Sequence, residues 1–145
     1  MKILVLGGAG KMGCISVQDL ANDKRVDEII IADVNALAAR TVVDYLDSNK
    51  IRVQEVDIND GETFLKILDG VDVCLNATVY YTNLTVMEAC LKSGVHYTDM
   101  GGLFYVTRKQ LELNDRFASA GLSAVLGMGS APGVPNLHAR YAADR

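Results

Sequence analysis

The chain has 145 residues, 50% of them hydrophobic and 22% charged, which is the size and composition of one globular domain. This composition excludes a disordered chain. A formal net charge of −4, without a dense cluster of Lys and Arg, excludes the electrostatic attraction on which nucleic-acid binding depends.

Short apolar runs alternate with amphipathic stretches along the chain. The runs predicted to form strands are Lys2 to Leu6, Glu28 to Asp33, Arg52 to Val56, Val71 to Asn76, Val95 to Thr98 and Ser123 to Leu126. The stretches predicted to form helices are Met12 to Ala21, Leu37 to Ser48, Gly61 to Leu68, Leu84 to Ser93 and Thr107 to Ala120. This alternation predicts an α/β fold, a doubly wound parallel sheet of the Rossmann type with strand order 3-2-1-4-5-6.

A glycine-rich segment follows the first predicted strand and opens the first predicted helix. Gly8, Gly10 and Gly13 permit a tight turn, close approach of the backbone to a pyrophosphate, and close packing of helix on strand. Lys11 and Met12 lie between the last two glycines, in the expected first turn of the helix. The segment therefore predicts a dinucleotide-binding turn.

Asp33 ends the second predicted strand, about 20 positions after Gly13, where a carboxylate can accept hydrogen bonds from an adenosine ribose. It would repel a ribose 2'-phosphate, and Val34 and Asn35 follow it in place of an Arg, so the sequence favours NAD over NADP. The alternative is a glycine-rich turn that binds nothing, with Asp33 capping a helix that begins near Asn35.

Polar residues also follow the third and fourth predicted strands. Asp57-Ile58 is expected to border the adenine, whereas Asn59 and Asp60 equally suit helix capping. Asn76-Ala77-Thr78 closes the fourth strand beside the crevice and is expected to line the ribose next to the nicotinamide.

Two residues are candidates for a catalytic group. Tyr80, with its neighbour Tyr81, could anchor a substrate or relay a proton, but a free tyrosine titrates at about pH 10 and packing is the favoured role. Asp99 leaves the fifth predicted strand ahead of Gly101 and Gly102, where a cofactor or substrate role and a structural role are equally supported.

The histidines and cysteines favour structural roles. His96 enters a strand, and neither it nor His138 has the partner that a catalytic histidine needs. Cys14, Cys74 and Cys90 each lie in an apolar run, as buried free thiols do, which suits a reducing compartment. No metal site is predicted. No apolar run reaches the length of a signal-peptide core or a membrane span, so we expect a cytoplasmic protein.

The C-terminal part carries a second glycine-rich loop, from Gly127 to Asn136, which could present backbone amides to an anionic group. We expect a Rossmann dinucleotide-binding domain over residues 1–135. Residues 136–145 look like the start of a connecting helix toward a substrate domain that this sequence lacks.

Several segments together resemble the saccharopine dehydrogenase family in its reductase-type branch, and the likeness spans nearly the whole chain. They are Gly8 to Gly13, Asp33, Asn76-Ala77 continued through Val86, Gly94 to Gly102, and Ala131-Pro132-Gly133 ending at Asn136. Saccharopine reductases carry Asp before the Pro-Gly of the last loop. Ala131 stands there in this chain, as the resemblance implies for lysine 6-dehydrogenase-like members.

The resemblance implies an NAD(P)-dependent dehydrogenase that passes hydride between the nicotinamide and a carbon bearing an amine or secondary amine of a small, lysine-related substrate. It also implies a homodimeric parent protein whose second domain supplies much of the substrate site, so this fragment alone is expected to be inactive. Two alternatives remain: a non-catalytic NAD(P)-binding sensor or scaffold, and a Rossmann reductase for another small carbonyl substrate.

Overall fold

Six parallel strands form one sheet in the computed structural model, which describes residues 1–145. The strands are β1 (Lys2–Leu6), β2 (Glu28–Asp33), β3 (Ile51–Glu55), β4 (Val73–Asn76), β5 (His96–Asp99) and β6 (Ala124–Val125). Their order across the sheet is β3-β2-β1-β4-β5-β6, and every neighbouring pair is parallel. The predicted fold class and strand order are therefore confirmed.

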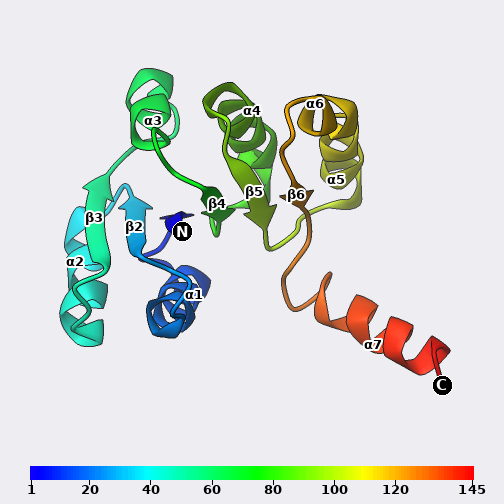
Figure 1. Cartoon of the computed structure of the whole chain (residues 1–145), viewed down its shortest axis with the longest axis horizontal. Coiled ribbons are helices and arrows are strands. Elements are labelled where there is room, and N and C mark those ends of the chain that lie inside the picture. Colours follow the sequence, from blue (N-terminus) through cyan, green and yellow to red (C-terminus); the bar gives the residue numbers. More distant parts are fainter.

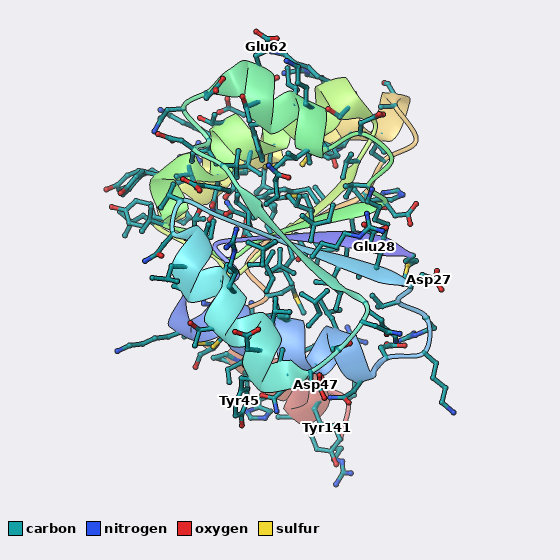
Figure 2. All side chains as sticks on the ribbon, turned by 90° about the vertical axis from the view of Figure 1, so that its left-hand side faces the viewer. Asp27, Glu28, Tyr45, Asp47, Glu62 and Tyr141 are labelled. Carbon is teal, nitrogen blue, oxygen red and sulfur yellow. The ribbon has the colours of Figure 1, made fainter.

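Helices cover both faces of this sheet. The helices of the chain are α1 (Lys11–Asn22), α2 (Ala36–Leu46), α3 (Gly61–Ile67), α4 (Asn83–Ser93), α5 (Phe104–Leu111), α6 (Asn114–Ser119) and α7 (Val134–Ala143), with a 3-10 turn η1 (Tyr80–Thr82) before α4, and all but α7 lie against the sheet (Figure 1). α1 and α2 lie on one side of the sheet, and α3 to α6 lie on the other (Figure 1). Seen along the sheet, Glu62 on α3 and Tyr45 on α2 mark the two opposite helix layers (Figure 2). None of the helices is long and apolar enough to cross a membrane.

The side chains of β1 show why its sequence is a continuous apolar run. Leu4 and Leu6 belong to the core cluster that contains residues of α3 and α4, whereas Ile3 and Val5 belong to the cluster that contains residues of α1 and α2. Successive side chains of a strand point to opposite faces. Because both faces are covered by helices, both sets must be apolar.

The prediction of one helix from Thr107 to Ala120 is wrong, because a turn separates α5 from α6. The N–H of Glu112 donates to the carbonyl of Lys109 at 3.2 Å, an i to i−3 bond that tightens the chain at this point. Gln110 of α5 and Phe117 of α6, on either side of this turn, are both buried.

α7 follows the loop after β6 and extends away from the sheet (Figure 1). It begins at Val134, two positions before the predicted start, because the Oδ1 atom of Asn136 accepts the N–H of Gly133 at 3.1 Å and closes the first turn. Pro135 fits in this turn, where no N–H is needed. None of the residues of α7 is buried.

Candidate functional site

The glycine-rich turn joins β1 to α1 at the carboxyl edge of the sheet. Gly7, which the sequence analysis did not single out, makes the turn with a φ of +75°. A Cβ at Gly13 would lie 2.2 Å from the carbonyl oxygen of Gly7, and a Cβ at Gly8 would lie 2.9 Å from Ile31. A Cβ at Gly10 would meet only the Gly7 oxygen, at 3.2 Å. Packing therefore requires Gly8 and Gly13, whereas Gly10 is exposed and has a single close neighbour.

The N-terminus of α1, at this turn, carries no side-chain cap and no acidic residue in its first turn. By contrast, Asn35 and Asp60 cap α2 and α3. Lys11 and Met12 are exposed in the first turn of α1. The amides at a helix N-terminus carry partial positive charge and favour an anion such as a phosphate. The start of α1 is therefore suited to hold one.

A cavity of about 310 Å³ lies beside the turn, where β1 to β4 end. Five of the residues predicted from the sequence line it: Asp33, Val34, Asp57, Ile58 and Thr78. The remaining lining residues are Leu6, Gly7, Ala32, Val56, Asn59, Val79, Tyr81 and Thr82. The cavity thus has two carboxylates in its wall and no Lys, Arg or His.

Asp33 connects the end of β2 to the glycine-rich turn. Its Oδ2 atom accepts the N–H of Ala9 at 3.1 Å, and its Oδ1 atom accepts the N–H of Asn35 at 3.0 Å. The cap of α2 is Asn35, whose Oδ1 atom accepts the N–H of Ala38 at 3.0 Å, so the alternative that Asp33 caps this helix is wrong. An ionised carboxylate has about four acceptor sites, which leaves capacity for ribose hydroxyls.

Asp57 is held by the turn that follows β3. Its Oδ1 atom accepts both the N–H and the side-chain amide of Asn59, at 2.9 and 2.8 Å. Capping of α3 belongs to Asp60, whose Oδ1 atom accepts the N–H of Thr63 at 3.2 Å. Hydrogen bonds from Thr63 lower the pKa of the Asp60 carboxyl group.

The side chain of Asn76 lies inside the protein, not in the crevice. It is 1% exposed; its Nδ2 atom donates to Oδ1 of Asn83 at 3.0 Å, and its Oδ1 atom accepts the N–H and the hydroxyl of Thr78 at 3.1 and 2.6 Å. The Asn76 side chain is therefore not available to line a ribose, and the prediction for this segment rests on its backbone and on Ala77 and Thr78. Instead, Asn76 fixes Thr78, while the backbone of Ala77 lies against the glycine-rich turn.

Asp99 is likewise enclosed, at 2% exposure. Its Oδ1 atom accepts the N–H groups of Gly101 and Gly127, both at 2.8 Å, and its Oδ2 atom accepts the hydroxyl of Tyr97 at 3.0 Å and the amide of Gln110 at 2.7 Å. Because four internal donors occupy the carboxylate, Asp99 is not free to act as a catalytic group, and the structural role is the one that fits. Burial and the charge of Asp99 raise the pKa of Tyr97, so its hydroxyl remains a neutral donor.

Tyr80 and Tyr81 occupy η1, next to the loop that follows β5. Their rings meet edge to face, with centroids 5.7 Å apart. The Cβ of Tyr80 would lie 2.5 Å from a Cβ at Gly102, so the glycine permits this approach. Tyr80 is 38% exposed and remains a candidate catalytic group, whereas Tyr81 lines the cavity.

The histidines lie away from this cavity. The Nδ1 atom of His96 accepts the N–H of Ser123 at 2.9 Å, so it joins β5 to the segment entering β6, as its structural interpretation predicts. His138 is exposed on α7.

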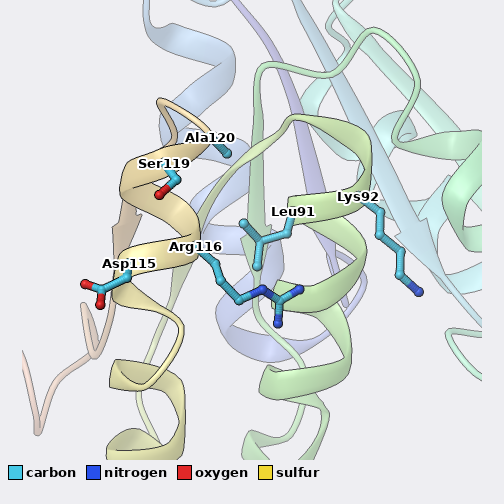
Figure 3. A pocket seen from close by; sticks show the side chains of 6 residues that line it. All are labelled: Leu91, Lys92, Asp115, Arg116, Ser119 and Ala120. Atoms are coloured by element: carbon cyan, nitrogen blue, oxygen red, sulfur yellow. The ribbon is translucent and has the colours of Figure 1, made fainter.

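A separate hollow of about 550 Å³ lies between α4 and α6 (Figure 3). It includes Lys92 near the end of α4, toward the edge of the sheet where β5 begins. The Nη2 atom of Arg116, which also lines it, donates to Glu88 at 2.7 Å, so this cation is already paired. The hollow is remote from the glycine-rich turn.

The glycine-rich turn, the uncapped helix and the adjoining cavity lie where the strand order reverses, between β1 and β4. This arrangement defines a nucleotide-binding domain of the Rossmann class. Residues 3–125 match the family described as the saccharopine dehydrogenase NADP binding domain. The chain belongs to this family, which confirms the resemblance found in the sequence.

Individual relatives agree with this assignment. The chain is 28% identical to carboxyaminopropylagmatine dehydrogenase of Synechocystis over 97% of its own length, and 26% identical to carboxynorspermidine synthase of Vibrio cholerae over 99%. It spans 37% and 39% of these two proteins. Saccharopine dehydrogenase (L-Glu forming) from Saccharomyces cerevisiae shares the fold, with a TM-score of 0.84 at 20% identity over 99% of this chain and 30% of that one. The family description names NADP, so the comparisons give no support to the predicted preference for NAD.

Proposed function

We propose that this chain is the cofactor-binding domain of a saccharopine dehydrogenase-like oxidoreductase, which binds one dinucleotide across the carboxyl edge of the sheet. The observation that carries the proposal is that the cavity containing Asp33 adjoins the uncapped N-terminus of α1. One ligand can therefore place its adenosine in the cavity and its pyrophosphate at the turn.

The residues of the turn and the cavity receive separate roles in this proposal. The segment Gly8 to Gly13, including Gly10, Lys11 and Met12, holds the pyrophosphate. Asp33 and Val34 face the adenosine ribose, and Asp57-Ile58 borders the adenine. Ala77-Thr78 faces the ribose next to the nicotinamide, supported from beneath by the buried Asn76.

We further propose that NAD binds more tightly than NADP. Support comes from the charges around the cavity, where Asp33 and Asp57 face no Lys, Arg or His. A 2'-phosphate on the adenosine ribose would bring about two negative charges next to Asp33 without a cation to pair with them.

The proposed reaction is hydride transfer between the nicotinamide and a carbon that bears an amine or secondary amine, so that oxidation gives an imine. The cofactor supplies the hydride chemistry and the protein supplies orientation. A lysine-related substrate rests on the resemblance to saccharopine dehydrogenases, whereas the names of the Synechocystis and Vibrio relatives favour a carboxylated polyamine. Tyr80 is the candidate in this chain for contact with the substrate.

The proposed domain organisation is a Rossmann domain over residues 1–135 and a connecting helix over residues 136–145. Support comes from α7, which buries none of its residues, and from the relatives, more than half of whose length lies outside the match. A substrate domain would then complete the active site, and this chain alone would bind the cofactor without turnover.

Titration calorimetry of the wild type and of Asp33→Ala with NAD and NADP tests the cofactor assignment. We expect the wild type to bind NAD more tightly, and Asp33→Ala to weaken NAD binding by about tenfold because ribose hydroxyls lose a charged acceptor. NADP should lose less, since its 2'-phosphate is released from repulsion. Thermal unfolding of the variant controls for loss of the fold.

If neither dinucleotide binds the wild type at millimolar concentration, the proposed function is wrong. If NADP binds more tightly than NAD, only the preference is wrong.

The substrate class needs a separate experiment. Assays of a longer parent enzyme with lysine, saccharopine and carboxynorspermidine would distinguish a lysine-related substrate from a carboxylated polyamine. Cofactor binding without turnover of any amine would favour a sensor.

A further inference from the structure

Two loops at the carboxyl edge pack against each other as one body. The paired loops are residues 100–103, after β5, and residues 126–133, after β6. A Cβ at Gly101 would lie 2.8 Å from the ring of Pro132, and a Cβ at Gly129 would lie 2.3 Å from the carbonyl oxygen of Met100, so these two glycines allow the loops to approach each other closely. Within the second loop, a Cβ at Gly127 would lie 2.9 Å from the same Pro132 ring.

The same glycines make the paired loops costly to order. Gly101 has a φ of +100° and Gly127 a φ of +71°, conformations that few other residues adopt. Glycine also loses the most backbone freedom when it is fixed in one conformation. A defined arrangement of these loops therefore requires an anchor from a rigid part of the fold.

Asp99 provides this anchor from the end of β5. Its Oδ1 atom accepts the N–H of Gly101 in the first loop and that of Gly127 in the second, both at 2.8 Å. Its backbone carbonyl accepts the N–H of Met128 at 2.8 Å. One buried residue thus holds both loops at the positions where their backbones are least restricted by side chains.

The anchor is connected to the cofactor side of the site. Asp99 and Asn76 are register partners on β5 and β4, and the hydroxyl of Tyr97 lies 3.0 Å from Asp99 and 3.5 Å from the Nδ2 atom of Asn76. Asn76 in turn fixes Thr78, whose Cγ2 atom would lie 2.9 Å from a Cβ at Gly7. Hydrogen bonds and this contact link the paired loops to the glycine-rich turn through the interior of the sheet.

We propose that Asp99 is a positioning residue, which fixes the paired loops as the wall against which the nicotinamide half of the dinucleotide binds. The inference rests on the proposed function. In a doubly wound sheet each half holds one mononucleotide, and the paired loops follow β5 and β6, in the half opposite the adenosine cavity. Asp99 acts through the loops and does not itself touch the cofactor, because its four acceptor contacts are internal.

The residues around Asp99 allow Asp99→Asn to keep part of the hydrogen bonding of the carboxylate. The Nε2 atom of Gln110 donates to Asp99, while the buried Oε1 atom of Gln110 has no partner. A rotated Gln110 amide can therefore accept a hydrogen bond from the new side-chain amide at position 99. Oδ1 of the asparagine still faces Gly101 and Gly127, although a neutral oxygen is a weaker acceptor than a carboxylate.

The test compares NADH with ADP-ribose, which contains the adenosine and pyrophosphate but lacks the nicotinamide. Calorimetry measures both affinities, and the fluorescence of bound NADH reports the environment of the nicotinamide ring. For Asp99→Ala we expect NADH binding about tenfold weaker, with its fluorescence close to that of free NADH, and ADP-ribose binding within about twofold of the wild type. Asp99→Asn should fall between the wild type and Asp99→Ala in NADH affinity.

Leu113→Ala is the control, because Leu113 is buried in the core cluster that contains Tyr97, a hydrogen-bond partner of Asp99, but belongs to neither loop. It should lower the stability of the fold without changing the ratio of the NADH and ADP-ribose affinities. If Asp99→Ala fails to fold, the same two affinities measured on Asp99→Asn test the proposal. Equal loss of both ligands, or unchanged NADH binding, in whichever Asp99 variant folds would overturn the positioning role. A wild type that binds neither ligand would refute the proposed function instead.

Discussion

Gly10 and Gly13 belong to one turn, but the space around their α-carbons differs. A methyl group at Gly13 would overlap the carbonyl oxygen of Gly7 at 2.2 Å, a backbone atom that cannot move without displacing the end of β1. A methyl group at Gly10 has contact only at 3.2 Å, and its other side is exposed. Packing therefore explains the glycine at position 13, whereas the glycine at position 10 is explained by the proposed approach of the pyrophosphate.

Substitutions at these two positions should accordingly separate stability from binding. Gly13→Ala is expected to lower the free energy of unfolding by about 1–3 kcal/mol, because overpacking displaces backbone. Gly10→Val should lower the free energy of unfolding in urea less than Gly13→Ala, because its Cβ meets one backbone oxygen at 3.2 Å and not at 2.2 Å, but it should obstruct the pyrophosphate, so that calorimetry detects little NAD binding. A Gly10→Val protein with full NAD affinity would show that the pyrophosphate does not lie on this turn.

At the level of helices and strands, the sequence predicts what depends on periodicity and spacing. The strands follow from the apolar runs, and their order follows from right-handed crossovers. Of the five predicted residues around the cavity, Asp33 follows from its spacing to the glycines, and the others from their places after strand ends. The break between α5 and α6 does not, because Leu113 and Phe117 continue an apolar period that a single helix would also bury. A helix pattern records which side chains are buried, but not whether the axis bends between them.

The sequence analysis also did not predict which way the polar side chains at the strand ends point. Asn76 and Asp99 end β4 and β5, next to the expected crevice, but both side chains are buried. Strand alternation contains the missing signal, since Tyr97 is buried and Asp99, two positions later, must share its face. Asn76 follows from the same reasoning through Cys74, which is fully buried on β4.

A pair of charged residues joins α4 to α6 and makes part of the stability dependent on pH. Oε2 of Glu88 accepts a hydrogen bond from Arg116 at 2.7 Å, and this bond and the charge of Arg116 lower the pKa of Glu88. A carboxyl group with a lowered folded pKa stabilises the fold above its unfolded pKa, about 4.3. This contribution is lost as the pH falls through the folded pKa.

Glu88→Gln should therefore be slightly less stable than the wild type at pH 7, and the difference should vanish in acid. The effect is small because the pair is partly exposed and screened by solvent. Urea unfolding at a series of pH values measures it, with the exposed Glu112→Gln as a control that should show no difference. A constant difference between wild type and Glu88→Gln across the series would contradict the pair as its cause.

On the scale of the whole molecule, the two halves of the sheet have different roles in the proposed cofactor binding. The half from β1 to β3 carries the glycine-rich turn and Asp33, and the half from β4 to β6 carries the buried Asp99 network and the paired loops. α7 is added to the second half without packing on it. Val134, Leu137 and Tyr141 are 48%, 62% and 59% exposed, so their apolar surface is not used within this chain.

Shortening the chain tests whether α7 contributes to the stability of the domain. A chain that ends at Asn136 keeps the first-turn bond to Gly133 and loses only exposed residues, so its free energy of unfolding should lie within about 0.5 kcal/mol of the full chain. A chain that ends at Leu122 also loses β6 and the Gly127 bond to Asp99, and it should be strongly destabilised. Equal destabilisation of the two shortened chains would contradict a domain boundary near residue 135, because α7 would then belong to the folding unit.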